Sequence, residues 1–128
     1  MLDLIIKNGS CYIDQDLKNH DIAIKDGKII EIGKIDSEAK ETFDAKGLIV
    51  LPGCIDTQTH FREPGSTDTE DLNSGSRAAI AGGITSVFEM PNTNPPTSTK
   101  KEFQRKLDLA KNRMYCNYAF YFGATADN

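Results

Sequence analysis

An alternation of strand-like and helix-like segments between residues 48 and 123 constrains the fold more than any other feature. An apolar run at Leu48–Leu51 leads into a first strand, and Ile84–Met90 and Tyr118–Phe122 indicate two more. Between these strands the spacing of apolar residues becomes helical. Strands that alternate with helices form parallel sheets, so this part of the chain is predicted to be α/β.

Both predicted helices begin with a recognisable signal. Thr67-x-x-Glu70 and Thr99-x-x-Glu102 have the form of a capping box, and Gly82-Gly83 is a typical end for the first helix. In the second helix the apolar residues fall on one face, at spacings of four, three and four: Phe103, Leu107, Ala110 and Met114. The basic pairs of that helix, Lys100-Lys101 and Arg105-Lys106, are expected on a solvated face.

Residues 1–50 show no helical pattern and are predicted to form a separate β domain, before an α/β domain at residues 51–128. Asp26-Gly27 between two apolar runs indicates a tight hairpin. Short strands are predicted at Leu2–Ile6, Cys11–Ile13, Asp21–Ile24 and Lys28–Ile32.

The first α/β strand is followed by the stretch Asp56–Gly65, which is rich in polar residues. Alternate residues of a strand point to the same face, and here they would be Asp56, Gln58, His60 and Arg62. A carboxylate, an amide, an imidazole and a guanidinium are costly to bury without partners. A functional site is therefore preferred over a core strand or a polar surface.

Two motifs at a consistent spacing resemble those of the amidohydrolase superfamily, and among its members they are closest to dihydroorotase. The first is the stretch Pro52–Gly65, and the second is the block Ser74–Thr85 followed by Met90-Pro91-Asn92-Thr93-Asn94-Pro95-Pro96. The resemblance covers essentially the whole chain. It implies a (β/α)8 barrel preceded by part of a small β-sandwich. Because such a barrel needs about 250 residues, only its first βαβαβ portion is expected here.

The resemblance assigns a metal site, with zinc as the expected ion. The family usually places two His residues on one strand, and this chain has Gln58 at the first position and His60 at the second. Neutral imidazole suits zinc, whereas an amide oxygen is a weaker ligand that is better matched to hard cations. His60 and Gln58 are thus the candidate metal ligands, and weakened binding is expected at Gln58.

Two further residues are candidate substrate contacts. The resemblance implies that Arg62 and Asn92 bind the substrate carboxylate, a role suited to a guanidinium fork and an amide NH2. Arg62 could instead form a surface salt bridge with Glu63 or Asp71. Asn92 could simply be a turn residue in the proline-rich loop.

The implied reaction is the interconversion of N-carbamoyl-L-aspartate and dihydroorotate in pyrimidine biosynthesis. The later metal ligands and the catalytic Asp of the family have no counterpart in residues 1–128, so no catalytic residue is assigned. The isolated chain is expected to be inactive. A complementary C-terminal polypeptide or another pyrimidine-pathway enzyme is a possible partner.

Two alternatives stay open. The chain could be a non-catalytic subunit or scaffold, for example for aspartate transcarbamoylase. It could also act on another cyclic amide or ureide, such as allantoin or a hydantoin. Against this second alternative, the similar allantoinases tend to carry Asn at the position of Arg62, and hydantoinases lack the Arg-Glu-Pro-Gly string.

Composition argues against several other partners. The chain has 15 Lys and Arg against 19 Asp and Glu, a net charge of −4, and no basic patch for nucleic acid. No apolar run approaches the roughly 18 residues that a membrane helix needs, and the N-terminus lacks a basic signal-peptide opening. Three Cys without a metal or redox spacing indicate reduced thiols in the cytoplasm, with Cys54 expected in the core.

Overall fold

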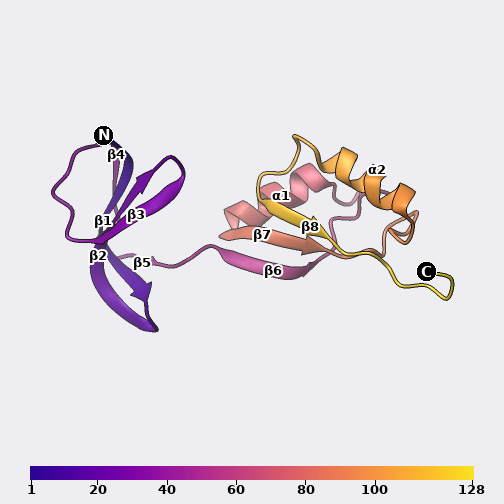
Figure 1. Cartoon of the computed structure of the whole chain (residues 1–128), viewed down its shortest axis with the longest axis horizontal. Coiled ribbons are helices and arrows are strands. Elements are labelled where there is room, and N and C mark those ends of the chain that lie inside the picture. The colour runs from indigo at the N-terminus through magenta and orange to yellow at the C-terminus, as the bar shows by residue number, and fades with distance from the viewer. The chain divides into compact units, whose positions relative to one another are not determined.

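The computed structural model describes all residues, 1–128, and the chain divides into two compact units, Met1–Pro52 and Gly53–Asn128. The first unit contains strands only, and in the second unit strands alternate with helices (Figure 1). The predicted α/β class is confirmed. Neither helix of the chain has the length and the hydropathy of a membrane-spanning segment.

The first unit is built on one mixed sheet. Its strands are β1 (Leu2–Ile13), β2 (Asp16–Lys25), β3 (Lys28–Gly33), β4 (Ala39–Asp44) and β5 (Ile49–Val50). The order is β3-β2-β1-β4, with β5 also paired to β1. The β1–β2 and β2–β3 pairs are antiparallel, whereas β4 and β5 run parallel to β1.

Two tight hairpins connect the antiparallel strands. Asp26 and Gly27 have φ of 51° and 71°, and Asp14 and Gln15 have φ of 53° and 66°. Positive φ at both central residues is the signature of a type I′ turn, whose twist matches that of the strands. The Asp26-Gly27 hairpin was predicted. The Asp14-Gln15 hairpin contains no Gly or Asn and was not predicted. The two short strands predicted before it are parts of one long strand, β1.

The core of the first unit is small. Ile5, Ala23 and Ile35 are buried together. The apolar run Leu48–Leu51 is largely exposed, with 62% of Ile49 accessible. One reason is that β5 pairs with β1 over only two residues.

The second unit is a three-stranded parallel sheet with two helices. In chain order its elements are β6 (Cys54–Thr59), α1 (Leu72–Ala81), β7 (Ile84–Glu89), α2 (Lys100–Ala110) and β8 (Asn117–Phe120). The strand order is β6-β7-β8. Both helices lie on one face of the sheet (Figure 1).

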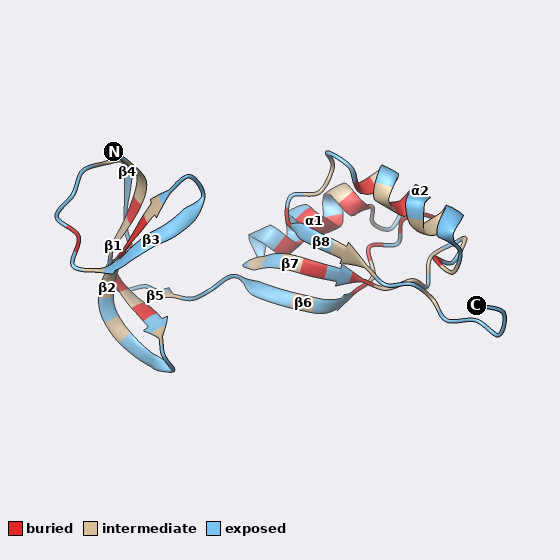
Figure 2. Cartoon of the chain, viewed as in Figure 1, coloured by how far each residue is buried: buried red, intermediate tan, exposed pale blue.

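The core of this unit lies between that face and the helices. Its buried residues come from the sheet, both helices and the connecting loops: Phe61, Leu72, Ala79, Val87, Ala110 and Cys116. By contrast, β6 is exposed along most of its length (Figure 2). Cys54, expected in the core, is exposed because it lies on this edge strand.

The helix ends show which capping signals operate. The Thr99 hydroxyl accepts a hydrogen bond from the Glu102 amide at 3.2 Å, as predicted for α2. The first helix begins at Asp71, not at Thr67, since the Asp71 carboxylate accepts from the Ser74 amide and the Ser74 hydroxyl accepts from the Asp71 amide. The Ser74 amide also lowers the pKa of the Asp71 carboxyl. The N-cap of α1 is therefore Asp71, four residues after the predicted Thr67.

Candidate functional site

Parallel strands place their carboxyl ends at one edge of the sheet, and the loops that follow β6 and β7 meet there. The Met90 amide donates to the Thr59 carbonyl at 2.9 Å, and the Tyr121 amide donates to the Glu89 carbonyl at 3.0 Å. His60 therefore begins one loop beside the start of the other. Open and closed α/β sheets bind ligands at this edge.

The two loops are also joined to each other farther from the sheet. The Asn94 amide donates to the Pro64 carbonyl at 2.9 Å. Gly65 has φ of 127°, and a Cβ there would lie 3.0 Å from the Asn94 Cβ. A side chain at residue 65 would thus crowd the neighbouring loop as well as strain its own backbone.

A third contact anchors the first loop on α1. Phe61 is buried against Gly75, where a Cβ would lie 2.5 Å from the aromatic ring. The helix backbone and the ring can approach this closely only because residue 75 has no side chain.

The structure brings two of the four predicted site residues together. His60 Nδ1 lies 2.9 Å from Asn92 Oδ1. An amide oxygen can only accept, so with Asn92 Oδ1 as the partner Nδ1 is the donor of this contact. This arrangement leaves Nε2 as the ring nitrogen that can face a ligand or a metal.

The other two candidates, Gln58 and Arg62, make no side-chain hydrogen bond or ion pair. The predicted common face for Asp56, Gln58, His60 and Arg62 is wrong, because β6 ends at Thr59. Only Asp56 and Gln58 belong to the strand. Arg62 has φ of 62° and sits exposed in the turn that follows, with its guanidinium free for a ligand.

The salt-bridge alternative for Arg62 is also wrong, since its proposed partners are taken by Arg113. Arg113 bonds both oxygens of Glu63, at 2.8 and 3.0 Å, and approaches Asp71 at 3.6 Å. The buried Glu63 carboxylate accepts from the Leu72 amide as well. The Glu63 carboxylate raises the pKa of the Arg113 guanidinium. This pair ties the turn carrying Arg62 to the start of α1.

A second ion pair, Glu89–Lys106, is completely buried. The Lys106 ammonium donates to the Met90 carbonyl at 3.0 Å and lies 5.1 Å from the centre of the Phe120 ring. Burial raises the pKa of the Glu89 carboxyl and lowers that of the Lys106 ammonium.

The solvated position predicted for Lys106 is therefore wrong. The sequence did contain a signal, because Lys106 follows Phe103 by three residues and precedes Ala110 by four. These spacings place it on the apolar face of α2.

Only part of a metal centre is present. No group of three or more His, Cys, Asp or Glu side chains could hold a metal ion. His60 is oriented as a ligand, and the Gln58 amide is free. Since zinc sites use three or four strong ligands, these residues do not fit zinc by themselves.

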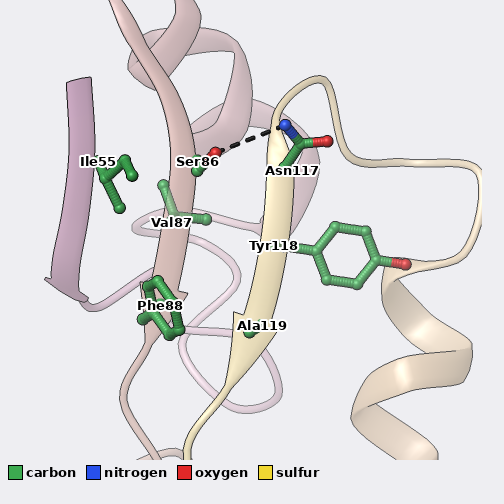
Figure 3. A pocket seen from close by; sticks show the side chains of 7 residues that line it. All are labelled: Ile55, Ser86, Val87, Phe88, Asn117, Tyr118 and Ala119. Carbon is green, nitrogen blue, oxygen red and sulfur yellow. Dashed lines mark hydrogen bonds between the residues drawn. The ribbon is translucent and has the colours of Figure 1, made fainter. Parts of the chain in front are cut away.

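An apolar hollow of about 240 Å³ lies on the sheet, away from this edge (Figure 3). The hydrogen bond between Asn117 and Ser86 is its main polar feature, at 3.4 Å. Its other lining residues are Ile55, Val87, Phe88, Tyr118 and Ala119. None of the residues that line the hollow is strongly basic, acidic or nucleophilic, so it is a poor catalytic site. The edge of the sheet where the loops after β6 and β7 meet is the better candidate.

Comparison with known proteins gives the same family from sequence and from structure. Residues 49–126 match the amidohydrolase family. The allantoinases of Escherichia coli O1:K1 and O81 are each 42% identical over 127 residues, which cover 98% of this chain and 28% of theirs. The chain thus spans under a third of the length of these relatives.

Solved structures add hydantoinases. The L-hydantoinase of Arthrobacter aurescens superposes with a TM-score of 0.89 at 35% identity, over 98% of this chain and 29% of that one. A D-hydantoinase from Thermus sp. gives 0.79 at 28% identity, over 94% and 27%. These relatives support the superfamily resemblance but do not single out dihydroorotase. The fold is that of the first part of a hydantoinase-type barrel, and the chain belongs to the amidohydrolase family.

Proposed function

We propose that this chain contributes to a hydrolase of cyclic amides whose substrate is a ureide ring of the allantoin or hydantoin type. The observation that carries the proposal is the 42% identity to allantoinases over 98% of the chain, which includes both loops of the candidate site. The superposition on an L-hydantoinase supports the same substrate class.

In this proposal each site residue has a separate task. His60 presents Nε2 to a metal, for which we propose zinc, and Asn92 fixes the ring by accepting from Nδ1. The Asn92 NH2 group stays available to donate to a substrate carbonyl. A bound metal would supply Lewis acidity, with its other ligands coming from outside these residues.

Dihydroorotate is the second candidate substrate, and Arg62 is the residue that favours it. The guanidinium is exposed and free of any ion pair. Dihydroorotate carries a carboxylate that this fork could bind in a bidentate manner, whereas allantoin and hydantoin carry none.

A chimera tests the proposed function. Residues 1–128 replace the matching 28% of the Escherichia coli O1:K1 allantoinase, and hydrolysis of allantoin, hydantoin and dihydroorotate is measured. We expect allantoin or hydantoin to be the best substrate, because this segment supplies one wall of a site completed by the recipient. The same remainder supplied as a separate polypeptide tests whether a C-terminal partner can complement the chain.

The control is the allantoinase remainder without residues 1–128, which should be inactive. If the chimera hydrolysed dihydroorotate best, dihydroorotate would replace the ureide ring as the proposed substrate. A folded chimera that hydrolyses none of the three rings would contradict the proposed function.

The Gln58→His substitution in that chimera should tighten zinc binding. Imidazole is a better zinc ligand than an amide, and even changes to residues that orient ligands alter affinity by about 10- to 100-fold. Competition with a chromophoric chelator would measure the change. Gln104→His, on the exposed side of α2, is the matched control and should leave the affinity unaltered. Equal affinities of the Gln58→His and parent chimeras would remove residue 58 from the metal site.

A further inference from the structure

Arg62 has a backbone conformation that an arginine side chain does not favour. Its φ of 62° lies in the left-handed region, where Gly, Asn and Asp are common and most other residues are rare. The other five non-glycine residues with positive φ are Asn or Asp, or lie in the Asp14-Gln15 hairpin. The conformation of Arg62 must therefore be imposed by contacts made elsewhere in the fold.

We propose that Glu63 and Arg113 are positioning residues, which hold Arg62 in this conformation and so place its guanidinium at the ligand-binding edge of the sheet. Neither Glu63 nor Arg113 has to touch the substrate in this role. The inference rests on the proposed function only in taking this edge as the place where a substrate binds.

Both neighbours of Arg62 are anchored on α1. Phe61 is buried against Gly75, and Glu63 Oε2 accepts a hydrogen bond from the Leu72 amide at 2.9 Å. Leu72 and Gly75 are three residues apart and both buried, so the two anchors lie on the same face of the helix. Arg62, between the anchored residues, is exposed. The chain is thus held immediately before and immediately after Arg62.

The second of these anchors depends on Arg113. Arg113 Nη1 donates to Glu63 Oε1 at 2.8 Å, and Nη2 donates to Glu63 Oε2 at 3.0 Å. Nη1 also donates to the Leu109 carbonyl at 3.0 Å, in the last turn of α2. A guanidinium that bonds both oxygens of a carboxylate fixes the orientation of that carboxylate as well as its position. Glu63 is therefore located relative to the end of α2 as well as to α1.

Two backbone hydrogen bonds also act on this turn. The Ser66 amide donates to the Arg62 carbonyl at 3.0 Å, and the Asn94 amide donates to the Pro64 carbonyl at 2.9 Å. These bonds close the turn and join it to the neighbouring loop, but neither reaches a helix. The Glu63 carboxylate is the group that ties the turn to α1 and to the end of α2.

NMR spectra of the whole chain test the proposal without substrate or metal. The nuclear Overhauser effect between the amide proton and the Hα proton of one residue is strongest at positive φ, because these two protons are then closest. We expect this effect at Arg62 to be as strong as at Asp26, which has φ of 51° in a hairpin of the first unit. A weak effect at Arg62 in the unmodified chain would overturn the proposal.

The decisive variant combines Glu63→Leu with Arg113→Met, which removes both charges and keeps most of the volume. We expect a folded protein in which the effect at Arg62 falls to the level of ordinary loop residues, while that at Asp26 is unchanged. If the folded double variant kept the strong effect at Arg62, the proposal would be wrong. The matched control is Glu102→Leu with Arg105→Met, the same change at the ion pair on α2, and it should leave Arg62 unaltered.

Arg113→Lys decides the question if the double variant does not fold. Lysine keeps the positive charge but lacks the planar fork that bonds both oxygens of Glu63. We expect a weaker effect at Arg62 with no change at Asp26, and an undiminished effect would overturn the proposal. None of these spectra depends on hydrolysis, so an inactive chimera would contradict the proposed function and leave this inference standing.

Discussion

Lys106→Met should lower the free energy of unfolding of the second unit by about 3–5 kcal/mol, because the substitution leaves the buried Glu89 carboxylate without its partner. Domains of this size are typically stable by about 5–15 kcal/mol, so much of the total would be lost. Urea unfolding followed by circular dichroism would measure the change.

The matched control is Lys101→Met, which removes the same group from the exposed side of α2 and should change stability by less than about 0.5 kcal/mol. Adding Glu89→Leu to Lys106→Met should restore most of the loss, since no buried charge is then unpaired. Equal effects of Lys106→Met and Lys101→Met would show that the pair is not buried.

The second large effect is expected for Arg113→Met, at about 2–3 kcal/mol. This variant leaves the buried Glu63 carboxylate with one remaining partner, the Leu72 amide. The value is set below that for Lys106 because the Arg113 side chain is 35% exposed and water can replace part of its role. The turn carrying Arg62 should loosen at the same time, which faster amide exchange at Ser66 would report.

Arg105→Met is the control for this variant. Arg105 forms an exposed ion pair with Glu102 at 3.5 Å on α2, and such pairs contribute about 0–1 kcal/mol. If Arg113→Met lowered the free energy of unfolding no more than Arg105→Met, the Glu63–Arg113 ion pair would contribute no more to stability than an exposed surface pair.

Local signals allowed much of the fold to be predicted. The three strands and two helices of the second unit, the Thr99 cap and the Asp26-Gly27 hairpin all depend on neighbouring residues. The short strands β4 and β5 were not predicted as such, because their positions depend on pairing with β1 and not on their own composition.

The site was predictable residue by residue but not as a geometry. His60 and Asn92 were singled out from separate motifs, yet their contact spans 32 residues and no local pattern encodes it. The pairs Glu63–Arg113 and Glu89–Lys106 were missed for the same reason. Charged residues in a sequence appear solvated until the fold supplies a buried partner.

The hydrogen bond between the Asn94 amide and the Pro64 carbonyl has a practical consequence for engineering. Grafting either loop alone from a relative would bring in a backbone that no longer matches its neighbour. Exchanges aimed at new ring specificity should therefore transplant residues 60–71 and 90–99 together, as one cassette.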